Sequence, residues 1–167
     1  RFVCDRFTEC GMQNSSSDEM NNVTAVLPGK SGKHTILATA HLDTIWEATA
    51  DHTVTVAEKT LSGAGLADNS LGIGALATLP LMLEHLGIEL ESDLILLGGA
   101  RSLGRGNLEG IRFFLENSSI NPDAVISIEG AQLGRLSYSC LGMMRAEINI
   151  SVPEEDDWKS YGETGAI

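Results

Sequence analysis

Short apolar runs recur along the chain and predict the strands of a buried sheet. The runs at residues 35–40, 93–97 and 124–128 are nearly continuous, as is usual for strands that are covered on both faces. An earlier apolar run at 23–27 ends at a Pro-Gly pair, and residues 53–57 alternate Thr and Val before the alternation breaks. The three continuous runs are predicted strands, and the other two are compatible with strands.

Helical spacing fills the intervals between these runs. The Asp-Asn-Ser sequence at 68–70 consists of residue types that cap helices, and leucine and isoleucine then recur at helical spacing until Gly87. A second, shorter amphipathic helix is predicted at 107–115. The Ser-rich stretch 13–22 and the Gly-rich stretch 61–67 favour irregular structure.

The order strand, helix, strand, helix, strand is typical of α/β domains. We therefore expect an α/β fold with a mostly parallel, mixed sheet and helices on both faces. Residues 136–139 and 146–152 alternate polar and apolar positions, which predicts two further strands with one face in water. Residues 1–152 are assigned to one domain core, and the polar residues 153–167 to a truncated tail or to the start of another domain.

Composition and charge narrow the classes of partner. With 167 residues, of which 43% are hydrophobic, the chain can bury a core. The net charge of −12 argues against nucleic acid and anionic membranes, because both bind basic surfaces. No apolar run approaches 18 residues, so no membrane span is expected. The three cysteines are loosely spaced and form no CxxC pair, which favours reduced thiols in a cytoplasmic protein.

Polar residues stand where α/β enzymes place their sites, past the carboxyl ends of strands. His41 and Asp43 follow the first buried strand, and in an extended chain residues two apart face the same side, so Asp43 can orient His41. Asp68 stands at a helix start, and Glu129 follows the third buried strand. One imidazole and two carboxylates would make a three-ligand site for a divalent cation such as zinc.

Each of these residues also has an ordinary structural interpretation. A His-x-Asp pair taken alone is usually structural, Asp68 alone can cap a helix, and Glu129 alone can be a solvated loop acid. The metal interpretation therefore depends on all three residues reaching one edge of the predicted sheet.

Several segments resemble one family of metallopeptidases. The segment 39–44, Thr-Ala-His-Leu-Asp-Thr, resembles the GHxD motif of the family that holds tripeptidase T, acetylornithine deacetylase, succinyl-diaminopimelate desuccinylase and aminoacylase. The Gly-rich segment 63–72 is similar to the family's segment with the bridging aspartate. The segment 93–115 looks like its next strand, loop and helix, and 127–130 like its later acidic ligand. The resemblance covers roughly residues 20–150.

The resemblance implies a zinc-exopeptidase-like catalytic domain, here incomplete. It implies that His41, Asp68 and Glu129 are the complete ligand set for one of the family's two metal ions, with Asp68 shared by both ions. Asp43 would orient His41, and the Asp68–Asn69 peptide bond would be cis. By the same resemblance, residues 153–167 would begin a lid domain.

The chain departs from the family pattern in the loop after the second buried strand. The family carries a Glu-Glu pair there, of which the first is the general base and the second ligates the other metal. Ser102 and Leu103 occupy those positions, and no acid lies between Asp93 and Glu109. The family's late histidine ligand also has no counterpart, because no histidine follows His85.

We therefore expect a metal-dependent peptidase or N-acyl amino acid amidohydrolase domain with impaired or no activity, and we assign no residue as catalytic. The alternative is a non-catalytic relative that acts as a binding or assembly module, and a domain without metal is a third interpretation. The expected cofactor is one divalent metal, zinc before manganese or cobalt, or none. An active protein would take small peptides or N-acyl amino acids, and family members often pair, which suggests a homodimer.

Overall fold

The computed structural model of the protein describes residues 1–130, 132, 134–142, 144 and 146–150. The chain divides into two units, Arg1–Gly134 and Arg135–Ile167. The helices and strands of the described residues all lie in the first unit. The expected division after residue 152, with the tail 153–167, falls outside the described residues.

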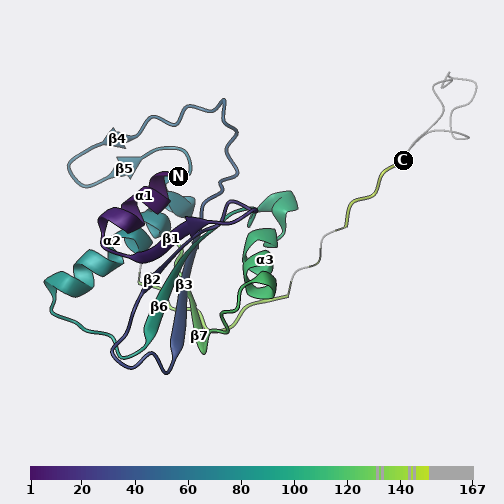
Figure 1. Ribbon diagram of the computed structural model, residues 1–167. Coiled ribbons are helices and arrows are strands. Elements are labelled where there is room, and N and C mark those ends of the chain that lie inside the picture. Colours follow the sequence, from purple (N-terminus) through teal and green to yellow (C-terminus); the bar gives the residue numbers. More distant parts are fainter. Residues whose placement is uncertain (131, 133, 143, 145, 151–167) are drawn as a thin grey trace, which may run out of the picture. The chain divides into compact units, whose positions relative to one another are not determined.

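A five-stranded sheet forms the centre of the first unit (Figure 1). Its order is β1 (Gln13–Ser17), β2 (Val23–Leu27), β6 (Asp93–Gly99), β3 (Thr35–His41) and β7 (Ala124–Ser127). β3 is parallel to β6 and to β7, whereas β2 is antiparallel to β6 and to β1. β2 therefore runs against the other strands of this sheet. The predicted α/β fold with a mostly parallel, mixed sheet is confirmed.

Two helices cover one face of this sheet. α1 (Phe2–Glu9) and α2 (Leu71–His85) lie together on that face, as Figure 1 shows. Their fully buried side chains, Phe7 and Leu76, pack against alternate residues of β2, β3 and β6. Burial of two such side chains is worth about 1.5–3 kcal/mol each, so this interface is a main source of stability.

A third helix covers the opposite face, as predicted. α3 (Glu109–Asn117) places Phe114 against Leu37 of β3 and against Ile95 and Leu97 of β6. Because successive strand residues point to opposite faces, β3 and β6 supply side chains to both cores. The position of these two strands at the centre of the sheet explains their nearly continuous apolar sequences.

Two stretches that favour irregular structure contain regular elements instead. The polar stretch 13–22 contains β1, whose mostly exposed side chains show no apolar alternation because β1 lies at the edge of the sheet. The Gly-rich stretch 61–67 contains the short strand β5 (Leu61–Ser62), which pairs with β4 (Thr55–Val56), and the beginning of the helical turn η1 (Leu66–Ser70). Backbone pairing, rather than side-chain pattern, defines these elements.

Two predictions about the last strands were wrong. β7 lies where it was predicted but is exposed, with Val125 and Ile126 remaining 53% and 52% exposed. β7 lies at one edge of the sheet, where β3 is its neighbouring strand on one side and no strand among the described residues covers the other side. Residues 136–139 and 146–150 form no strand. Alternation of polar and apolar residues indicates which side of a strand would face water, but a strand also needs a neighbouring strand for its backbone hydrogen bonds. Residues 151 and 152 lie outside the described residues.

One helical stretch, Leu66–His85, is long and apolar enough to cross a membrane by length and composition. This is weak support for a span, because core helices of soluble proteins pass the same test. Asp68 and Asn69 have non-helical backbone angles and separate η1 from the 15 residues of α2. A helix of that length reaches about 22 Å, short of the about 30 Å of a bilayer core.

Candidate metal centre

Three candidate ligands meet at one edge of the sheet. β3 ends at His41 and Glu129 closely follows β7, and the carboxyl ends of parallel neighbours lie at the same edge. Asp68 lies in η1, where the Asp68–Asn69 peptide bond is cis, as the family resemblance implies. His41 Nε2 is 2.9 Å from Asp68 Oδ1 and 3.5 Å from Glu129 Oε2. One ligand atom from each residue lies within 4.8 Å of the others.

The backbone fixes the imidazole of His41 from the other side. Its Nδ1 lies 2.8 Å from the carbonyl oxygen of Asp43. Because a carbonyl only accepts, Nδ1 carries a hydrogen, and Nε2 faces the two carboxylates. A nitrogen lone pair repels carboxylates at such distances, so a positive charge stabilises the cluster. A divalent cation bound between Nε2 and the two carboxylates would supply that charge.

The spacing of the three groups fits a divalent cation. Tetrahedral zinc, with bonds near 2 Å, holds neighbouring ligand atoms about 3.3 Å apart. The distances of 2.9 and 3.5 Å from His41 to its two partners lie on either side of this value. The His41 side chain is 9% exposed, whereas those of Asp68 and Glu129 are 52% and 54% exposed. A cation held here would therefore keep a position open to solvent, as catalytic zinc sites do.

Asn69 connects the segments that carry the two carboxylates. Its side chain is 2% exposed, and its amide nitrogen donates to the carbonyl of Ile128 at 2.8 Å. Its amide oxygen accepts the N–H groups of Gly72 at 3.1 Å and Gly130 at 3.0 Å. These bonds tie the start of α2 to the residues on both sides of Glu129, so Asn69 positions the carboxylates relative to each other.

The backbone carbonyl of Asp43 contacts His41, whereas the carboxylate of Asp43 binds the backbone of a different segment. The nearest carboxylate oxygen, Oδ1, is 3.9 Å from His41 Nδ1, too far for a hydrogen bond. The two oxygens instead accept the backbone N–H groups of Ser102 at 3.0 Å and Leu103 at 2.7 Å. Asp43 thus links the candidate ligand His41 to the loop that follows β6.

Asn22 holds the base of the same loop. Its side chain is fully buried, and its Oδ1 accepts the N–H of Ala100 at 2.9 Å. Its Nδ2 donates to the carbonyl of Gly110 at 3.0 Å and to Asp18 Oδ2 at 2.7 Å. The end of β6 and the start of α3 are therefore fixed by one side chain, from the residue that precedes β2.

Comparisons with known proteins find peptidases with a similar fold. The sequence profile of Peptidase family M28 matches residues 22–99. Human carnosine dipeptidase 1 is 15% identical, with a TM-score of 0.59 over 77% of this chain and 31% of that one. A tripeptidase from Staphylococcus aureus is 15% identical, with a TM-score of 0.60 over 77% and 36%. The fold is that of a zinc exopeptidase catalytic domain. A dinuclear metal-binding M20 peptidase from Bacillus subtilis is 13% identical, with a TM-score of 0.51 over 75% and 34%.

The exopeptidase-like chain spans about a third of the length of these solved structures. At such low identities the likeness shows the fold, and any activity of the chain belongs to a proposal. A search among curated proteins finds no match.

The exopeptidase-like domain lacks acids in the loop after β6. Ser102 and Leu103 stand where the resemblance places an acidic pair, and no Asp or Glu lies between Asp93 and Glu109. Glu109 itself forms an ion pair of 3.2 Å with Arg101. Within the described residues, one group of three acids and histidines has the spacing of a metal site, and this loop adds nothing to it.

Two positioning residues of this domain, Asn22 and Asn69, were not among the candidates predicted from the sequence. Asn69 stands beside Asp68 in a segment read as a helix cap, and its proximity to a candidate ligand was the one available signal. Asn22 precedes an apolar run, a placement too common to be informative. Some contacts of each side chain reach residues 59 to 88 positions away, and local patterns do not reveal those contacts.

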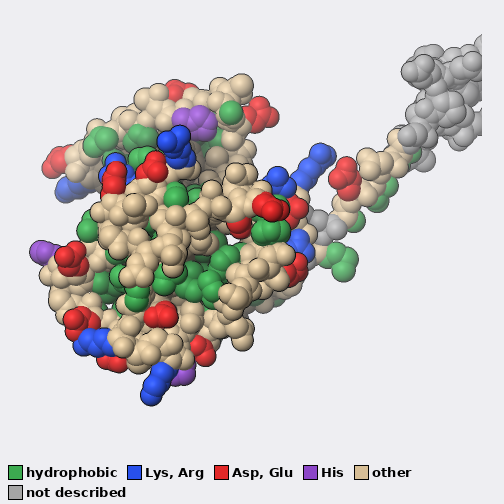
Figure 2. All heavy atoms as spheres, in the orientation of Figure 1, with side chains coloured by type: hydrophobic (Ala, Val, Ile, Leu, Met, Phe, Trp, Pro, Cys, Tyr) green, Lys and Arg blue, Asp and Glu red, His purple; other side chains and the backbone are tan. Residues whose placement is uncertain are grey.

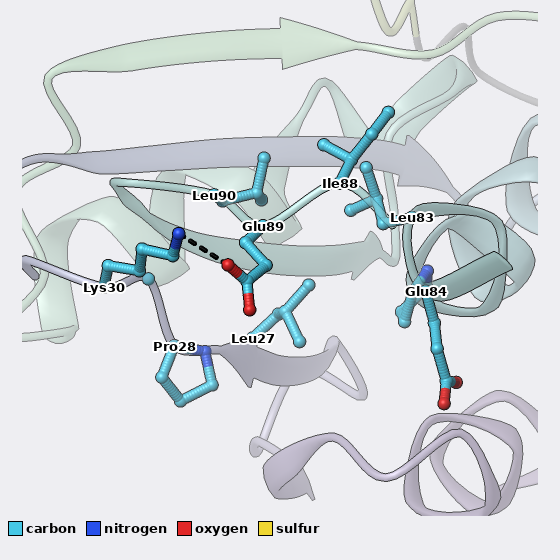
Figure 3. Close-up of a pocket in the computed structure, with 10 residues that line it drawn as sticks. Leu27, Pro28, Lys30, Leu83, Glu84, Ile88, Glu89 and Leu90 are labelled. Carbon is cyan, nitrogen blue, oxygen red and sulfur yellow. Dashed lines mark ion pairs between the residues drawn. The ribbon is translucent and has the colours of Figure 1, made fainter. Parts of the chain in front are cut away.

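A separate cavity of about 320 Å³ lies at the opposite end of the sheet (Figure 3). Leu27, Leu83 and Ile88 contribute apolar surface, and Lys30 pairs with Glu89 at 2.5 Å. The Lys30 ammonium lowers the pKa of Glu89 below its usual value. β3 and β6 begin at this end and finish at the other, so this cavity does not belong to the candidate metal centre.

Proposed function

We propose that this chain is the metal-binding part of a peptidase or N-acyl amino acid amidohydrolase type of domain, and that it hydrolyses such substrates poorly or not at all. One divalent cation would be held by His41, Asp68 and Glu129. The observation that carries the proposal is the convergence of three ligand atoms within 4.8 Å beside a loop without acids. Zinc suits an imidazole and two carboxylates, and manganese or cobalt would also fit.

The expected loss of activity follows from the loop after β6. A divalent cation supplies Lewis acidity to hydrolysis, but proton transfer still needs a positioned acid–base, worth roughly 10²–10⁴ in rate. The Ser102 hydroxyl is a poor base, and Leu103 has no polar group. Asp43 holds the backbone of both residues at 3.0 and 2.7 Å, so its own carboxylate is occupied.

The second candidate function is a binding or assembly module that keeps the exopeptidase fold without its chemistry. The acid-free loop favours this function, and under it small peptides or N-acyl amino acids would be bound rather than cleaved. On the face drawn in Figure 2, acidic and basic side chains are interspersed over the first unit, without a broad basic patch among the described residues. We therefore do not propose nucleic acid as a partner. A cytoplasmic location and a homodimer remain proposals from the sequence.

Zinc binding tests the metal part of the proposal. The purified chain should bind about one zinc per chain, as measured by elemental analysis after dialysis, and zinc should raise its melting temperature. A ligand present at 100 times its Kd stabilises a fold by about 2.7 kcal/mol. His41→Ala should lose both effects because it removes the buried ligand.

His52→Ala is the matched control, since His52 is exposed and its ring contacts the carbonyl of Glu47 instead of the cluster. It should bind zinc as the natural chain does. Equal zinc content in His41→Ala and the natural chain would refute the proposed ligand set. A natural chain that binds no zinc even in excess would leave the binding module as the better function.

Hydrolysis tests the second part. With zinc present, the natural chain should release amino acid from N-acetyl amino acids or tripeptides at the buffer rate or slowly, far below 1 s⁻¹, as followed by ninhydrin or chromatography. The double variant Ser102→Glu, Leu103→Glu restores a base and should be faster, whereas Ser102→Gln, Leu103→Gln has the same shape without the charge and should not. Metal-dependent turnover near 1 s⁻¹ or above by the natural chain would disprove the proposed inactivity.

A further inference from the structure

A cavity of about 330 Å³ lies beside the candidate metal centre, between the two helices on one face of the sheet. α1 contributes Phe2 and Val3 to its lining, and α2 contributes Ile73 and Ala77. These side chains are apolar, so the cavity offers a surface that favours an apolar group. Its volume is near the lower end of the about 300–1,000 Å³ typical of ligand pockets, which suits one side chain or acyl group better than an oligopeptide.

The cavity reaches the metal centre through a shared wall. His41 and Leu42, at the end of β3, line it together with Ser70, two residues after Asp68. The imidazole of His41 therefore contacts both spaces, with Nε2 directed toward Asp68 and Glu129. A molecule in the cavity would lie against a residue that the proposed function assigns to the metal.

Arg6 supplies the permanent charge of the lining. Its guanidinium lies 5.3 Å from the centre of the Phe2 ring and pairs with Glu9 at 2.8 Å. The Arg6 and Glu9 side chains are 52% and 57% exposed, so water screens the pair and it is worth little. A ligand carboxylate can replace or share this partner, because guanidinium binds carboxylates through two parallel hydrogen bonds.

We propose that this cavity binds a small apolar carboxylate, with its apolar group between α1 and α2 and its carboxylate at Arg6. The interpretation of this ligand as a substrate or substrate analogue rests on the proposed function. The binding itself requires no metal, so the two can fail separately.

Gly74 allows the cavity to be filled without disturbing its surroundings. It lines the cavity, and a Cβ at this position would meet no atom within 4 Å. Gly74→Leu therefore places an isobutyl group in the cavity and also removes a glycine from a helix interior, where glycine is unfavourable. Ala75→Leu is the matched control, because the neighbouring Ala75 is exposed and does not line the cavity.

The probe is N-acetyl-leucine, compared with its uncharged amide, and calorimetry or NMR titration measures binding in a chelator and again with zinc. Without zinc the natural chain should bind the acid more tightly than the amide. Gly74→Leu should weaken binding of the acid about tenfold or more, Ala75→Leu should leave it unchanged, and Arg6→Gln should abolish the preference for the acid.

No saturable binding by the natural chain, or equal binding by Gly74→Leu, would overturn the proposal. Equal affinity of the natural chain for acid and amide would overturn the role of Arg6. Zinc content, determined on the same samples, separates this result from the proposed function. A chain that binds the acid in chelator but takes up no zinc would keep the cavity proposal and refute the metal site.

Discussion

Replacing Asn69 with leucine is expected to lower the free energy of unfolding by about 3–5 kcal/mol and to abolish zinc binding. Leucine has a similar size but neither donates nor accepts hydrogen bonds. The carbonyl of Ile128 and the N–H groups of Gly72 and Gly130 would all lose their partner. Each unsatisfied buried group costs about 1–3 kcal/mol. Urea denaturation followed by circular dichroism measures the stability, and elemental analysis measures the zinc.

The matched control is Asn117→Leu, the same change at an exposed position whose side chain makes one described bond, to the carbonyl of Phe113. This variant should lose less than about 1 kcal/mol and keep its zinc. A stable Asn69→Leu chain with full zinc content would show that the two carboxylates do not depend on the Asn69 connection.

Replacing Gly110 with alanine is expected to destabilise the fold by about 3 kcal/mol or more. The added Cβ would overlap the carbonyl oxygen of Ala100 and would lie 2.5 Å from Asn22 Oδ1. Both neighbours are fixed, since the Asn22 side chain is fully buried and holds Ala100 and Gly110 at once. The backbone must therefore move, which would separate the start of α3 from the end of β6.

The same change at Gly74 in α2, Gly74→Ala, is expected to stabilise the fold instead. Because no atom lies within 4 Å of the position that the new Cβ would take, alanine should stabilise the fold by about 0.5–1 kcal/mol. Thermal and urea unfolding measure the stability of both variants against that of the natural chain. A Gly110→Ala chain that is as stable as the natural chain would mean that the loop after β6 yields easily, and it would weaken the argument that Asn22 fixes this loop.

The local sequence pattern was sufficient to predict elements that have one clearly apolar side or that are covered on both faces. β3 and β6 are flanked by strands and covered by helices on both faces, so their sequences carry the strand signal directly. The helix starting near Ser70 was likewise visible from its cap residues and leucine spacing. The edge strand β1 was not predicted, because its mostly exposed side chains, Gln13 to Ser17, show no apolar pattern.

The residue types and order along the chain also determined the candidate ligands. His41, Asp68 and Glu129 were indicated because each stands at a strand end or a helix start, and parallel strands end at one edge. The absence of acids between Asp93 and Glu109 is equally a property of the sequence. The expected loss of a general base therefore follows from the sequence alone.

Tertiary structure alone decided how these residues are held. The sequence predicts that Asp43 orients His41, but the fold shows the carbonyl of Asp43 in that role and its carboxylate on the loop at Ser102 and Leu103. It also shows Asn69 between the two carboxylate segments and a cavity beside His41. Each of these features depends on contacts between residues far apart in the chain, and such contacts exist only after the sheet and helices have packed.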